Sequence, residues 1–201
     1  AMDDPTFIAV SGKGNFKTLE DLVSASKKAP LNWGVAQIGG TEHIGLAQFA
    51  KEAGIKFKVV PFGSGAQMVQ ALMAGKIDAT LPNVSEAANQ VADGSFRALA
   101  VMAEDRLKDY PNVPSTYEKG IKAKCSTTRG YAVLASTPQP IIDQISKAMV
   151  KAMKHDVFKS YLAGAGLTVE SSVAGTKVWD KHLKAEYKVA ASALKELGLV
   201  K

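Results

Sequence analysis

The chain has 201 residues, of which 46% are hydrophobic and 22% are charged, and its formal net charge is +6. These values are ordinary for one globular domain, or one domain with an appendage, that buries a real core. The basic residues are dispersed and mostly lysines, which argues against a dedicated nucleic-acid surface. The single cysteine, Cys125, excludes an internal disulfide and a cysteine-based zinc site.

The first half of the chain alternates short apolar runs with amphipathic stretches. The runs predict buried strands at residues 6–11, 31–33, 57–61, 77–81 and 97–102. Between them apolar residues return at helical spacing, and Thr18 with Asp21 forms a capping-box pattern at the start of the first helix. Strands that alternate with helices indicate crossover units, so we expect an α/β fold with a mostly parallel sheet flanked by helices.

The second half of the chain has a different pattern. Residues 104–124 are polar and rich in turn-forming residues, and the apolar run at 130–135 predicts one more strand. Amphipathic helices are expected at about 141–153, 157–163 and 179–197. The only plausible boundary, at 136–140, divides the chain into an α/β lobe of residues 1–135 and a C-terminal helical segment of residues 136–201.

A glycine-rich turn separates the strand at 31–33 from the helix that follows it. Gly39 and Gly40 let the backbone bend sharply, and Thr41 is a candidate N-cap of the helix. The N–H groups of a first helical turn have no intrahelical partner, so they can seat an anion such as a carboxylate or a phosphate. A turn that needs glycine and a cap only for structural reasons explains the same residues equally well.

Two further turns share this character, and ligands of open α/β sheets bind where such turns follow the carboxyl ends of strands. Together the three turns predict a small polar cup for a carboxylate or a sugar-like solute. The candidate ligand-binding residues are Gly39, Gly40, Thr41, His43, Gly63, Ser64, Gly65 and Asn83. No cofactor or metal is expected, because the turns lack a dinucleotide fingerprint and a Walker pattern and His43 cannot build a metal site alone.

A catalytic interpretation of these residues is weak. His43 has no nucleophile near it in the sequence, so we expect it to hydrogen-bond a backbone group or a ligand. Ser64 does not lie in a nucleophile elbow, and Cys125 has no identifiable histidine partner. A small hydrolase that uses Ser64 or Cys125 is therefore the least favoured hypothesis, and the protein is not expected to be an enzyme.

Several segments match one known family in order and spacing along nearly the whole chain. They are the loop at 34–43, Val-Val-Pro-Phe-Gly-Ser-Gly-Ala at 59–66, Leu-Met-Ala-Gly-Lys-Ile-Asp at 72–78, Arg-Ala-Leu-Ala-Val at 97–101 and Pro-Asn-Val-Pro at 111–114. In these segments the chain resembles the solute-binding proteins of tripartite tricarboxylate transporters, the TctC or Bug family.

The resemblance implies a periplasmic binding protein of the second topological type, in which two lobes close over a small carboxylate by hinge motion. It implies a periplasmic location, delivery of the solute to membrane transporter subunits, and ligand contacts at the eight residues named above. The family's opening region has no counterpart here. We therefore expect the second lobe of the family fold, followed by C-terminal helices that would pack with or bridge to the missing first lobe.

One residue departs from this expectation, and one alternative remains. Glu42 lies beside the proposed anion seat and would repel an anionic solute unless its side chain points away. The alternative function is that of an isolated lobe acting as an oligomerising or protein-interaction module without a transport role. Loss of a lobe would expose apolar surface on the C-terminal helices, through which a homo-oligomer would form.

Overall fold

The structure, a computed structural model, describes residues 2–165 and 167–200. Its centre is a sheet with the strand order β4 (Phe57–Pro61), β3 (Leu31–Val35), β5 (Ala79–Thr80), β2 (Phe7–Ser11) and β6 (Phe96–Val101). Strand β3 pairs in parallel with β4 and β5, whereas β2 pairs antiparallel with β5 and β6. The expected α/β fold is confirmed, and the sheet is mixed because β2 alone runs against its neighbours.

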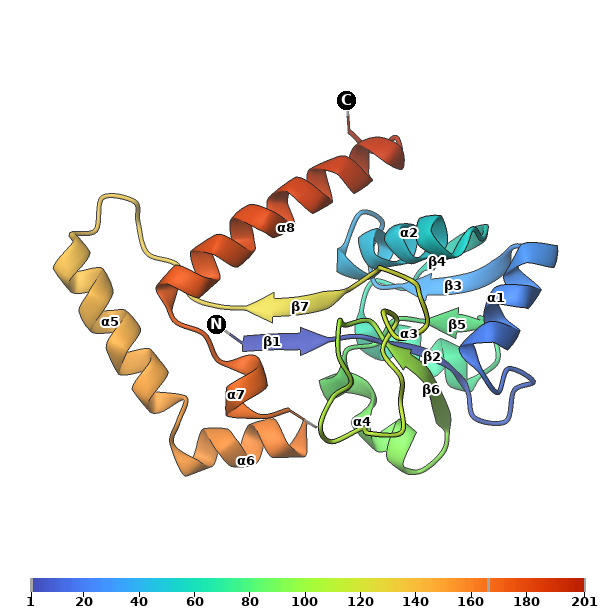
Figure 1. The fold of residues 1–201 in the computed structure, drawn as a ribbon, viewed down its shortest axis with the longest axis horizontal. Coiled ribbons are helices and arrows are strands. Elements are labelled where there is room, and N and C mark those ends of the chain that lie inside the picture. Colours follow the sequence, from blue (N-terminus) through green and yellow to red (C-terminus); the bar gives the residue numbers. More distant parts are fainter. Residues whose placement is uncertain (1, 166, 201) are drawn as a thin grey trace.

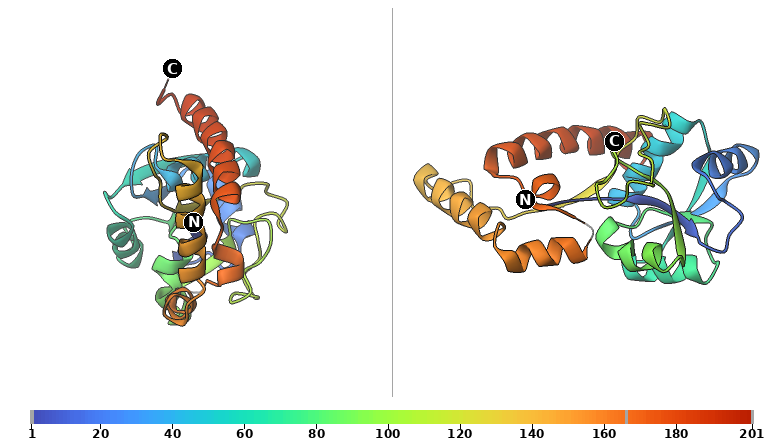
Figure 2. Two further views of the ribbon diagram at one scale, coloured as in Figure 1. Left: turned by 90° about the vertical axis from the view of Figure 1, so that its left-hand side faces the viewer. Right: turned by 60° about the horizontal axis from the view of Figure 1, so that its bottom comes forward.

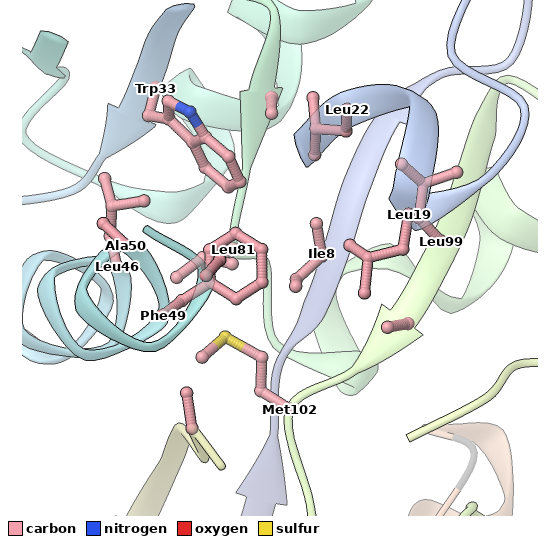
Figure 3. Packing of buried hydrophobic residues seen from close by; sticks show 14 of the residues in the cluster. Ile8, Leu19, Leu22, Trp33, Leu46, Phe49, Ala50, Leu81, Leu99 and Met102 are labelled. Carbon is pink, nitrogen blue, oxygen red and sulfur yellow. The ribbon is translucent and has the colours of Figure 1, made fainter. Parts of the chain in front are cut away.

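Helices cover both faces of this sheet. Helices α1 (Leu19–Lys28) and α2 (Thr41–Ala53) pack on one face, and α3 (Gly65–Met73) and α4 (Val84–Ala92) pack on the other. The alternation along β2 separates the two cores, because Ile8 points to the first face and Phe7 to the second. Trp33 and Phe49 fill the first core, with their ring centroids 5.8 Å apart (Figure 3).

A two-stranded antiparallel ribbon connects this lobe to the C-terminal helices. It pairs β1 (Met2–Pro5) with β7 (Ser126–Arg129). In Figure 1 the ribbon lies between the sheet and helix α5 (Gln139–Ala152), which forms the far end of the molecule. The chain then continues through α6 (Asp156–Gly164), α7 (Val169–Ser172) and α8 (Thr176–Glu196). In this ribbon the N-terminal strand β1 therefore lies beside β7, through which the chain continues toward the C-terminal helices.

The C-terminal helices α6, α7 and α8 contact the first 135 residues again (Figure 2). Helix α6 contributes the fully buried Leu162 to the second core of the lobe. Helix α8 returns to α2, where Lys51 Nζ lies 3.0 Å from a carboxylate oxygen of Glu196. Within the described ranges, no helix has both the length and the apolar character needed to cross a membrane.

The expected helices and five of the expected strands are confirmed, with differences at three places. Gly40, not Thr41, is the N-cap of α2, and the strand predicted at 77–81 shrinks to the two residues of β5. The strand predicted at 130–135 is wrong. Instead, the polar residues just before it form β7, because β1 is available to pair with them. In the apolar run itself, Tyr131 and Leu134 are 75% and 78% exposed.

Candidate functional site

The three candidate turns meet at one edge of the sheet. Because β3 runs parallel to β4 and β5, the carboxyl ends of these strands lie on the same side. The Gly63 N–H donates to the Ala36 carbonyl at 2.8 Å, which joins the first two turns. A Cβ built on Gly65 would lie 2.8 Å from the carboxylate oxygens of Glu86 on α4, which places the third turn next to the second. The structure therefore brings the sequence-predicted turns together.

The turn before α2 is held by its own histidine. Gly39 has a φ of +75°, in the left-handed region that favours glycine, and its N–H donates to His43 Nδ1 at 2.9 Å. His43 is 6% exposed, and burial lowers the pKa of its imidazole. The ring is therefore neutral at pH 7 and fixes the turn, while the first N–H groups of α2 have no intrahelical partner.

The turn before α3 uses a serine for the same purpose. Gly63 has a φ of +79°, and Ser64 is the N-cap of α3, with its Oγ accepting a hydrogen bond from the Gln67 N–H at 3.3 Å. The N–H groups at the start of α3 therefore point to the same edge of the sheet as those of α2. Two helix N-termini with the positive ends of their dipoles thus lie at this edge, that of α2 on one face of the sheet and that of α3 on the other.

Asn83 lies at this edge but turns its side chain inward. It is 2% exposed, its Nδ2 donates to the Asp4 carbonyl at 2.7 Å, and its Oδ1 accepts from Thr127 Oγ1 at 3.1 Å. The fully buried Asp4 carboxylate also accepts from the Ser85 N–H at 3.2 Å, from the Ser85 hydroxyl, and from Arg129 Nη1 at 2.9 Å. Asn83 is therefore a link between α4 and the β1–β7 ribbon, and its role as a ligand contact stays a prediction.

Sequence reasoning identified Glu42 at this edge but missed a second carboxylate, Glu86. Glu86 is in the first turn of α4, and loss of hydration raises the pKa of its carboxyl. The negative charges of Glu42 and Asp4 raise it further, while a hydrogen bond from the Asn83 N–H and the charge of Arg129 oppose the rise. The spacing of Asn83 and Glu86 matches a helix-start pattern and could have drawn attention to Glu86.

Two further observations limit the chemistry of the site. Thr41 lines a cavity of about 510 Å³ between α2, β7 and α8, together with Cys125. Burial raises the pKa of the Cys125 thiol to about 12, so it carries no thiolate at neutral pH and is a poor nucleophile. Among the described residues, no group of three or more His, Cys, Asp or Glu side chains is arranged to hold a metal ion.

Comparisons with known sequences agree on one family. The sequence profile of the tripartite tricarboxylate transporter family receptor, TctC, matches residues 2–199. The UPF0065 protein in the TAR-I ttuE-ttuC' intergenic region of Agrobacterium vitis is 26% identical over 90% of this chain. Protein BugT of Bordetella pertussis is 23% identical over 83% of it. The chain spans about half the length of these relatives, 54% of the first and 52% of the second.

Solved structures share the fold. A TctC solute binding protein from Polaromonas matches with a TM-score of 0.83 and 24% identity, over 97% of this chain and 67% of that protein. Rpa4515 from R. palustris, solved with adipate, matches with a TM-score of 0.81 and 22% identity, over 98% of this chain and 66% of that protein. The neighbours establish the α/β fold of periplasmic binding proteins for the chain.

We predict that Asn83→Ala destabilises the chain by about 1–3 kcal/mol, because it leaves the Asp4 carbonyl and the Thr127 hydroxyl without their buried partner. The measurement is the free energy of unfolding in urea. Asn89→Ala, at an exposed position of the same helix, is the matched control and should change stability by less than about 0.5 kcal/mol. Equal effects of the two substitutions would contradict the structural role of Asn83.

Proposed function

Because the chain belongs to the tripartite tricarboxylate transporter receptor family, we propose that it binds a small carboxylate solute and passes it to a membrane transporter from the periplasm. The observation that carries this proposal is the meeting of the starts of α2 and α3 at one edge of the sheet, joined by the hydrogen bond from Gly63 to Ala36. Backbone N–H groups at helix N-termini that lie at the same edge of a sheet are well suited to a carboxylate.

In this proposal each residue of the site has a separate task. The backbone N–H and the hydroxyl of Thr41 bind the carboxylate, together with the N–H groups that follow Ser64. The glycines around them allow the solute to approach the backbone. The His43 side chain stabilises the turn by accepting the hydrogen bond from the Gly39 N–H. The proposed ligand-binding set remains Gly39, Gly40, Thr41, His43, Gly63, Ser64, Gly65 and Asn83, of which Asn83 would act mainly by holding the edge in place.

We further propose a division into a binding lobe, residues 1–135, and a helical segment, residues 136–201, that packs against a first lobe. Two features support it. Along α5, which the structure describes in full, no side chain is buried, although the helix is amphipathic. Between α5 and α8 lies a cavity of about 330 Å³ lined by apolar side chains that include Ile145, Met149 and Leu183. The 201 residues by themselves supply one side of such a clamp, so on their own they should bind the solute with millimolar affinity or weaker.

The same apolar surface favours a second candidate function, an isolated lobe that associates with itself. Ile141, Ile145 and Leu183 are 47%, 39% and 43% exposed on the two helices. Apolar groups gathered on neighbouring faces in this way promote association when nothing covers them. The two candidates differ in what covers the surface, and therefore in the oligomeric state that they predict for this chain.

We predict that Thr41→Pro weakens carboxylate binding about tenfold, because it removes one N–H donor and the hydroxyl from the seat. Proline is tolerated as the first residue of a helix, and the preceding Gly40 has the extended backbone that proline requires, with φ −76° and ψ 179°. Binding is measured by titrating the 201-residue chain with a panel of small carboxylates, including adipate and malate, in a calorimeter.

The chain offers a matched control for this substitution. Thr176 is the first residue of α8 and follows Gly175, whose φ of −83° and ψ of 178° nearly equal those of Gly40. Thr176→Pro should therefore leave the affinity unchanged. Equal affinities of the two variants would count against the proposed function, as would the absence of heat when each acid is raised to roughly ten times a millimolar dissociation constant.

For the second candidate, we predict that the chain forms concentration-dependent oligomers in size-exclusion chromatography with light scattering. Ile145→Lys should shift the population to monomer, because a charge would then lie in the apolar interface. Val157→Lys is the control, since Val157 is 75% exposed on α6 and does not line the cavity between α5 and α8. A strict monomer at high concentration would contradict self-association.

A further inference from the structure

The outer side of α8 carries a row of positive charge. All five lysines of this helix are exposed, and they recur at the spacing i, i+4, i+7, i+11 and i+18: Lys177, Lys181, Lys184, Lys188 and Lys195. Because an α-helix has about 3.6 residues per turn, this spacing places the five side chains along one line parallel to the helix axis. The lysine row formed in this way extends over roughly 27 Å.

The lysine row lies on the side of α8 that faces away from the rest of the chain. On the inner side, a Cβ on Gly130 would lie 2.6 Å from the ring of Trp179, and Glu196 pairs with Lys51 of α2. None of the five lysines lines the cavity between α5 and α8 or the cavity between α2, β7 and α8. In Figure 1, α8 runs along the outside of the molecule. The row is therefore an open surface of the described chain.

The charge of the lysine row is not balanced by ion pairs within the described part of the chain, because none of its lysines takes part in one. The three acidic residues of α8 lie elsewhere on the helix. Glu186 lines the cavity toward α2 and β7, Glu196 pairs with α2, and Asp180 lines the cavity toward α5. Successive lysines three or four residues apart repel each other and destabilise a helix. An anionic partner would relieve this repulsion.

The features of the lysine row favour a lipid surface over a protein as this partner. Lysine is depleted in protein–protein interfaces but typical of the polar face of helices that lie on membranes. A straight row of flexible point charges also suits a flat layer of phosphate groups better than one fixed carboxylate. Beside the row, Tyr187 is 77% exposed and lines a hollow of about 440 Å³ with Lys184 and Lys188. Tyrosine is enriched at the level of lipid headgroups.

We propose that the lysine row is a docking surface for an anionic phospholipid bilayer, on which α8 lies parallel to the membrane. The lysines bind the phosphate groups electrostatically, and Tyr187 lies at the level of the headgroups. This inference goes beyond the proposed function, because the row faces away from the cavity that Thr41 lines and docking requires no solute. Docking would concentrate the protein at a membrane surface.

The test measures co-sedimentation of the 201-residue chain with lipid vesicles. One preparation contains phosphatidylglycerol and phosphatidylcholine in equal parts, and the other contains phosphatidylcholine alone. The chain should bind only the anionic vesicles, and it should dissociate when salt is raised from about 0.05 M to about 0.5 M, because added ions screen the row.

A triple variant of the lysine row, with Lys181→Gln, Lys184→Gln and Lys188→Gln, should bind the anionic vesicles at least about thirtyfold more weakly. Each lysine near an anionic surface contributes about fivefold to the partition coefficient. Glutamine and lysine have similar helix propensities, so α8 should stay folded, and circular dichroism checks that it does.

The matched control is the triple variant with Lys13→Gln, Lys76→Gln and Lys108→Gln. These lysines are exposed outside α8 and take part in no ion pair among the described residues, and their loss leaves the same net charge as the first triple variant. The control should bind within about threefold of the unaltered chain.

Three results would overturn the proposal. Equal binding of the two triple variants would show that attraction follows net charge and not the lysine row. Absence of binding to the anionic vesicles at low salt would exclude the lipid surface directly. If soluble polyglutamate bound the chain and the anionic vesicles did not, the row would fit an acidic protein segment instead. The titration with carboxylates is unaffected by any of these results, so the proposed function is tested separately.

Discussion

The parallel pairing of β3 with both β4 and β5 is the constraint on which the site depends. Parallel strands leave the sheet in the same direction, so the turns that follow β3, β4 and β5 are delivered to one edge. The hydrogen bonds from Phe62 to Val35 and from Gly63 to Ala36 then lock the first two turns together. Two helix N-termini lie at the same edge of the sheet for this reason, and the chemistry of the edge follows from what surrounds them.

A second constraint connects this edge to the rest of the chain. The buried Asp4 carboxylate and the Asn83 amide join the start of α4 to both strands of the β1–β7 ribbon. The ribbon leads to the helical segment, whose helix α5 lies at the far end of the molecule in Figure 1. A shift of the ribbon would therefore also displace the start of α4 at this edge, because a buried hydrogen-bond network resists partial disruption.

The features that can be predicted from the sequence are those that depend on residues close to one another in the chain. The capping box of Thr18 and Asp21 is present in α1, and strand β4 begins and ends at the predicted residues, because each depends on neighbours in the chain. The reversed direction of β2, the replacement of a strand at 130–135 by β7, and the inward-facing Asn83 depend on partners more than forty residues away. Glu86 escaped notice for a related reason, since it faces Gly65 only after α3 and α4 have packed together.

The central claim is that the N–H groups at the starts of α2 and α3 hold the carboxylate. Backbone amide chemical shifts of the 201-residue chain, recorded with and without saturating solute, test it most directly. The account predicts that the largest changes fall on the amides of Thr41, Glu42, Gly65 and Ala66. If the largest changes fall on the backbone amides of residues that line the cavity between α5 and α8, and those four amides do not shift, the claim is contradicted.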